Sequence, residues 1–157
     1  MVLSVDIFKP LCKEDEHYFK ALHLLTTSSN NKEFEEQILA LTKIFIDSLN
    51  EQSLVVDVVV EKPNAKGIDK LEAFLKSKNL KIDEMITFFR NLQQLRSSVV
   101  AHRMSPNRKE TKRVLKYFEY DSKSLDSILE TIFNNLIISL NTLRSVLINQ
   151  GHEVQIK

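Results

Sequence analysis

The stretch IDEMITFFRNLQQLRSSVVAH, residues 82–102, decides the fold of this chain. Its apolar residues recur at three- and four-residue steps, which is the spacing of one face of an α-helix. They are Ile82, Met85, Phe89, Leu92 and Val99, with Phe88 and Leu95 beside them. A helix with so broad an apolar side has to pack against other helices.

The same spacing recurs along most of the chain. Four more helices and a short helical turn are predicted, over residues 14–25, 32–51, 68–78, 124–151 and 114–118. Asn31 and Ser124 are suitable N-caps, and Pro106 ends the helix that begins at Ile82. We therefore expect an all-α, mostly antiparallel bundle of four to six helices.

The bulk composition fits one helical domain. The chain has 157 residues, of which 43% are hydrophobic and 27% are charged, and it contains only 2 glycines and 3 prolines. So few turn residues disfavour a sheet protein. We expect a single domain over residues 1–157, although the irregular start, residues 1–13, would also suit a piece of a longer protein.

The sequence predicts a cytoplasmic protein that does not enter a membrane. Its apolar runs are far shorter than a membrane span, and its N-terminus lacks the basic and apolar regions of a signal peptide. A lone cysteine, Cys12, excludes an internal disulfide and fits a reducing compartment.

Residues 54–61 depart from the helical pattern. The sequence LVVDVVVE is rich in β-branched residues and is typical of a strand, yet no second strand is predicted to pair with it. We interpret it as an extended segment or a short hairpin arm. Pairing with the same segment of another copy would satisfy its open edge.

Metal and cofactor chemistry have no support in the sequence. The four histidines, at positions 17, 23, 102 and 152, form no pair with the spacing of zinc ligands. Two glycines cannot build a phosphate-binding loop. We expect no metal and no cofactor.

Arg96 and His102 stand out because they precede the most basic part of the chain. Six residues rotate a helix by about 600°, so these two side chains do not share a face of an ideal helix. They would converge if the helix unwound near His102, or if a second copy supplied its own pair. The basic residues that follow, against Glu110 alone, are Arg103, Arg108, Lys109, Lys112, Arg113 and Lys116. With a net charge of only +1, any attraction for a polyanion has to come from this cluster.

The stretch from Leu95-Arg96 to Ala101-His102 resembles the signature of the HEPN (higher eukaryotes and prokaryotes nucleotide-binding) domain superfamily. That signature is an arginine, four to six residues, and a histidine that often follows a small residue. The resemblance implies a four- to five-helix bundle, frequent homodimers, and metal-independent ribonucleases of toxin–antitoxin and antiviral systems. An antitoxin would then be a further partner.

The resemblance also implies roles for individual residues. His102 would act as general acid or base on the ribose 2′-hydroxyl or the leaving oxygen, and Arg96 would hold the scissile phosphate. Ser97 would supply a hydrogen bond. The residues expected to position RNA are Arg103, Arg108, Lys109, Lys112 and Arg113.

A non-catalytic function remains open beside the ribonuclease. In that alternative, Arg96 is solvated, His102 only ends a helix, and the chain is a helical module that dimerises, binds a partner protein or binds RNA without cleaving it.

Overall fold

The computed structural model describes residues 6–10, 30–80, 82–101 and 109–152. These residues form helices and loops, with no strand among them, which confirms the predicted all-α fold. In chain order the elements are α2 (Asn31–Thr42), the π-helical turn η1 (Lys43–Asp47), the 3-10 turn η2 (Ser53–Val55), α3 (Gly67–Ser77), α4 (Asp83–Ala101), α5 (Lys109–Tyr117) and α6 (Leu125–His152). The helix predicted over residues 14–25 lies outside the described residues.

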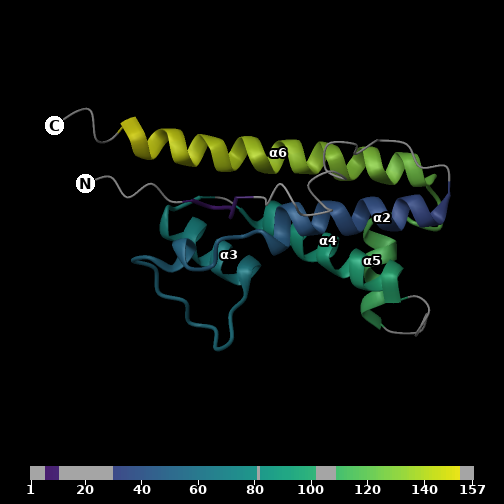
Figure 1. Ribbon diagram of the computed structural model, residues 1–157, viewed down its shortest axis with the longest axis horizontal. Coiled ribbons are helices and arrows are strands. Elements are labelled where there is room, and N and C mark those ends of the chain that lie inside the picture. The colour runs from purple at the N-terminus through teal and green to yellow at the C-terminus, as the bar shows by residue number, and fades with distance from the viewer. Residues whose placement is uncertain (1–5, 11–29, 81, 102–108, 153–157) are drawn as a thin grey trace.

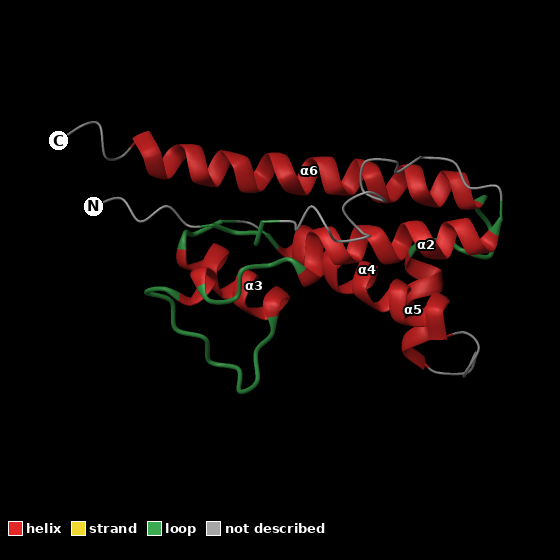
Figure 2. Ribbon diagram, viewed as in Figure 1, coloured by secondary structure: helices red, strands yellow, loops and turns green. Residues whose placement is uncertain are grey.

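The helices form a bundle around α4. Figure 1 shows α6 as the longest rod, with α2 beside its first half and α4 beneath α2. In the same view α3 and α5 lie on opposite sides of α4, and Figure 2 shows that one long loop joins η2 to α3. The second half of α6 extends past the end of α2.

The core lies where the apolar faces of α2, α4 and α6 meet, and the apolar face of α3 packs into the same cluster. The predicted apolar side of residues 82–102 is buried as expected, and Phe89, Leu92 and Leu95 are fully enclosed. The buried residues that face them from the two neighbouring helices include Phe34, Ile38, Leu41, Ile128, Leu129 and Ile132. The period of the sequence therefore predicts which face of each helix is buried.

The starts of α2, α3, α4 and α6 were predicted to within one residue, whereas α5 begins at Lys109, five residues before the predicted turn of residues 114–118. Asn30, and not Asn31, caps α2: its side-chain oxygen accepts a hydrogen bond of 3.0 Å from the backbone N–H of Glu33. Ser124 caps α6 as predicted, because its hydroxyl accepts the backbone N–H of Ser127 at 3.2 Å. Both caps satisfy N–H groups that have no partner inside the helix.

The helix predicted over residues 32–51 is an α-helix only as far as Thr42, and it then continues as the π-helical turn η1. The Thr42 hydroxyl lies 2.9 Å from the Ile38 carbonyl, and a π-helical turn follows from Lys43 to Asp47. Such side-chain bonds to the preceding turn bend helices. Beyond the turn, Leu49 forms an isolated bridge with Phe8, so the chain around Phe8 packs on this end of the bundle.

The segment predicted to be extended is shorter than expected. Residues 53–55 form the 3-10 turn η2, which buries Leu54, and Asp57 takes a positive φ of 59°. A residue in the left-handed region interrupts a continuous strand. Only residues 58–61 then run without helix or turn, with Val59 almost fully exposed. The pairing of this segment with a second copy stays a prediction.

Candidate functional site

Arg96 is held by a carboxylate from a neighbouring helix. It lies in the last third of α4, and its Nη1 atom is 2.8 Å from Oδ2 of Asp47. Asp47 is the last residue of the π-helical turn η1. Both side chains are about one-third exposed, at 33% and 31%. π-helical turns inside helices often occur at functional sites, and this one carries the partner of the predicted catalytic arginine.

The two serines after Arg96 point in different directions. Ser97 is exposed, and its hydroxyl donates a hydrogen bond of 3.2 Å to the Gln93 carbonyl one turn earlier. Ser98 is 4% exposed, and its hydroxyl has no hydrogen-bond partner in the described part of the chain. The hydroxyl of Ser97 therefore reaches solvent, whereas that of Ser98 does not.

Three of the predicted site residues, His102, Arg103 and Arg108, lie outside the described residues. In the sequence His102 comes directly after Ala101, where α4 ends, and Arg108 directly before Lys109, where α5 begins. Of the predicted site residues, the structure therefore describes Arg96 and Ser97 on α4, and Lys109, Lys112 and Arg113 on α5.

Helix α5 presents one basic face to solvent. Its buried side is formed by Thr111 and Val114. The opposite side carries four exposed cations within an arc of about 100° on an ideal helix. They are Lys109, Lys112, Arg113 and Lys116, and none of them has an acidic partner within the residues that the structure describes. We call this surface the basic face of α5.

Tyr117 borders the basic face of α5 and was not predicted as a site residue. It is 44% exposed and lies one turn after Arg113. Its ring rests edge-to-face on Phe118, with 4.8 Å between centroids. Burial and the charge of Glu84 raise the pKa of Tyr117, so the phenol stays neutral at physiological pH. The signal in the sequence was an aromatic residue four positions after an arginine on one helical face.

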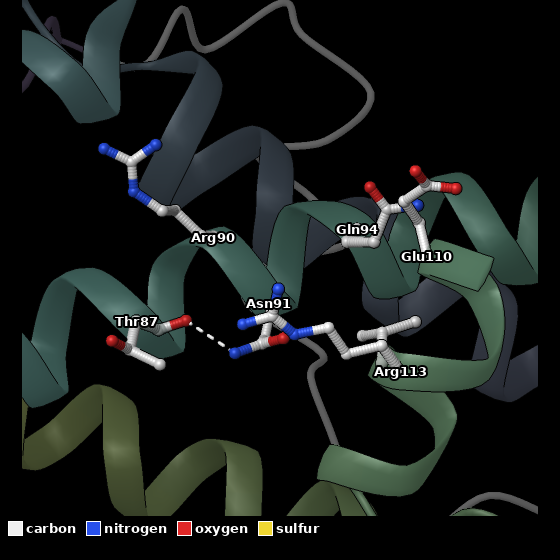
Figure 3. A pocket seen from close by; sticks show the side chains of 7 residues that line it. Thr87, Arg90, Asn91, Gln94, Glu110 and Arg113 are labelled. Atoms are coloured by element: carbon white, nitrogen blue, oxygen red, sulfur yellow. Dashed lines mark hydrogen bonds between the residues drawn. The ribbon is translucent and has the colours of Figure 1, made fainter.

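A small cavity of about 240 Å³ lies between α4 and α5. Figure 3 shows the side chain of Arg113 extending from α5 toward Asn91 of α4, while Arg90 points away from it. The wall also includes Thr87, Gln94 and Glu110. Asn91 donates a hydrogen bond of 2.9 Å to the Thr87 carbonyl. The cavity is lined mainly by polar residues and joins the basic face of α5 to the middle of α4.

The structure does not bring Arg96 and Arg113 to the same side of α4. Arg96 follows Asn91 by five residues and Gln94 by two, which on a helix are rotations of about 140° and 200°. Arg96 faces the η1 end of α2, whereas Arg113 meets α4 on the side of Asn91 and Gln94. A ligand that touches both would have to pass around α4.

Arg90, which sequence reasoning did not single out, is part of a charge network with α3. Its Nη2 atom lies 2.9 Å from Asp69 and 2.7 Å from Glu72. Although burial opposes it, hydrogen bonds from Lys62 and Arg90 hold the pKa of Asp69 below its usual value. With both carboxylates engaged by Arg90, this network fixes α3 on α4.

The described residues contain no cluster of three histidine, cysteine or acidic side chains that could hold a metal ion. None of the described helices combines the length and apolar content that crossing a bilayer requires.

Comparison with known proteins gives no relative: no family model, no curated protein and no solved structure matches this chain.

Proposed function

We propose that this chain binds RNA on the basic face of α5 and cleaves it, without a metal, as an endoribonuclease of HEPN type. The observation that carries the binding half is the basic face itself, with four exposed cations and the exposed ring of Tyr117 beside them. The cleavage half rests on the spacing of Arg96 and His102 in the sequence.

RNA is the ligand whose chemistry matches this surface. Lysine and arginine side chains contact phosphates without reading sequence. An exposed aromatic ring stacks on an unpaired base, which is how single-stranded RNA is commonly held. Because the whole chain carries a net charge of only +1, the attraction has to come from a local cluster of cations such as this face.

Cleavage would follow the chemistry of the ribose itself. The 2′-oxygen attacks the adjacent phosphorus and the bond from phosphorus to the 5′-oxygen breaks, which leaves a 2′,3′-cyclic phosphate and a 5′-hydroxyl. His102 would take the proton of the 2′-hydroxyl while water protonates the leaving 5′-oxygen, or it would protonate the 5′-oxygen while water takes the proton of the 2′-hydroxyl. Either task suits an imidazole near neutral pH. Arg96 would stabilise the charge that gathers on the phosphate.

The ion pair with Arg96 supports a positioning role for Asp47. Asp47 accepts one hydrogen bond, from Nη1 of Arg96. A guanidinium has five N–H donors, so most of them remain for a phosphate. A side chain already fixed in direction loses less rotational freedom when it binds.

The RNA strand would have to pass around α4, because the basic face of α5 and Arg96 lie on different sides of that helix. The HEPN resemblance further suggests that the chain acts in a toxin–antitoxin or antiviral system. A partner protein such as an antitoxin would then inhibit the ribonuclease.

The basic face of α5 is tested by Lys112→Glu. We expect weaker binding to single-stranded RNA of any sequence, and a salt dependence of log K that is shallower by about 1 for each phosphate that the variant no longer touches. Fluorescence anisotropy at several salt concentrations measures both. Lys32→Glu, at an exposed position of α2, makes the same change in net charge and should leave binding near that of the wild type. Equal binding by the two variants would remove α5 from the RNA site.

A non-catalytic helical module is the second candidate, and the ion pair of Arg96 favours it. If the Arg96–Asp47 pair only fixes α4 on the end of α2, Arg96→Ala would cost at most about 1 kcal/mol of stability, as partly exposed ion pairs do. RNA would then stay intact with the wild type and the variant alike. The ribonuclease proposal instead requires that the wild type cleaves RNA and that Arg96→Ala does not.

A further inference from the structure

The outward face of α6 carries apolar side chains with no partner in the described structure. Three of the six exposed large hydrophobic residues among the described ones lie here: Ile137 at 55%, Ile138 at 64% and Leu140 at 37% exposure. Ile137 is at the centre of the outward arc, and Leu140 and Ile138 lie on its two flanks. Adjacent exposed apolar residues on one helix mark a surface that another molecule covers.

Two oppositely charged side chains lie on either side of Ile137, at equal distances along α6. Glu130 lies seven residues before Ile137, and Arg144 lies seven residues after it. Seven residues are almost two full turns, or about 10.5 Å along the axis, so the three side chains form one line on the helix surface. Both charged side chains are exposed, and neither has an ion-pair partner among the described residues.

This line is complementary to itself. When a second α6 is laid against the first in the opposite direction, with a two-fold axis at Ile137, the two isoleucines meet. Glu130 of each copy then faces Arg144 of the other, so the same ion pair forms twice. We infer that this face of α6 binds a second copy of the chain in an antiparallel arrangement.

The order of Glu130, Ile137 and Arg144 along α6 favours a second copy of the chain as the molecule that covers this face. An unrelated partner would place no constraint on the spacing of Glu130 and Arg144 about Ile137, whereas a two-fold symmetric interface requires that spacing. The interface goes beyond the proposed function and does not depend on RNA. It is also separate from the pairing of residues 55–60 that the sequence suggests.

The proposed interface is small. One helix laid on another covers less than the roughly 1,000 Å² that a tight interface needs, so the dimer should be weak and depend on protein concentration. Because two exposed ion pairs take part, added salt should weaken it further.

Charge reversal tests the inference on the whole chain. We expect sedimentation velocity to show a monomer–dimer equilibrium for the wild type. Glu130→Arg and Arg144→Glu should each raise its dissociation constant about tenfold or more, because like charges then face each other twice. The double variant E130R/R144E restores opposite charges and should restore the dimer. Circular dichroism checks that all four proteins keep their helix content.

Three results would overturn the inference. A wild-type chain that stays monomeric at every concentration would do so, and so would single variants that associate as well as the wild type. The third is a double variant that associates no better than the singles, because only an ion pair between Glu130 and Arg144 of two copies predicts the rescue.

Discussion

Replacing His102 by alanine should slow RNA cleavage by about 100-fold or more, the usual contribution of a general acid or base. The loss should appear in the maximal rate rather than in RNA affinity, because the proposed binding surface is on α5. Single-turnover cleavage of a labelled RNA measures the rate, and anisotropy measures the affinity. The unfolding midpoint should stay close to that of the wild type, because the enclosed core is built from α2, α4 and α6 side chains that remain unchanged.

His152→Ala is the matched control for this experiment. It removes another histidine, at the end of α6, and should leave the cleavage rate unaltered. Asp47→Asn provides a graded comparison, because it keeps the shape of the side chain and removes the charge that holds Arg96. We expect it to slow cleavage less than Arg96→Ala does. A His102→Ala protein that cuts RNA as fast as the wild type would exclude His102 from the chemistry.

Phe89→Ala should lower the free energy of unfolding by about 3–5 kcal/mol, the range found when a large buried aromatic side chain is removed. Phe89 is 0% exposed and lies on the face of α4 that packs against the rest of the core. Its removal would leave a cavity that neighbouring helices cannot fill without shifting. Equilibrium unfolding in urea measures the change.

Val59→Ala is the corresponding control for stability. Val59 is 86% exposed in the loop between η2 and α3, so its truncation should change the unfolding free energy by less than about 0.5 kcal/mol. A Phe89→Ala protein as stable as this control would mean that α4 is not at the centre of the bundle.

The helices were predictable from the sequence because burial repeats with the period of the backbone. Phe34, Ile38 and Leu41 of α2 and Phe89 and Leu92 of α4 are enclosed, as their spacing indicates. The cap of α2 was misplaced by one residue because Asn30 and Asn31 are adjacent and chemically identical. Only the backbone geometry decides which of them accepts the N–H of Glu33.

The segment after α2 was harder to predict because local geometry overrides residue preference. Residues 54–60 favour a strand by composition, yet burial of Leu54 and the positive φ of Asp57 produce a turn instead. β propensity reflects fit to a sheet surface, and the described residues provide no sheet.

The partners of the candidate site could not be predicted because they are distant in sequence. Asp47 is 49 residues before Arg96, and Arg90 meets carboxylates 18 and 21 residues away. A single sequence gives the period of each helix but not the rotation of one helix against another. The rotation of α4 relative to its neighbours determines which residues meet: Arg96 faces η1, whereas Arg113 of α5 faces Asn91.

Incubation of the purified chain with mixed RNA in the presence of a chelator is the most direct test of the proposed function. If Arg96 and His102 act on the ribose 2′-hydroxyl without a metal, the RNA should be cut at an unchanged rate, and the fragments should end in 2′,3′-cyclic phosphates. Intact RNA after prolonged incubation, or cutting that stops when the chelator is added, would contradict the proposal.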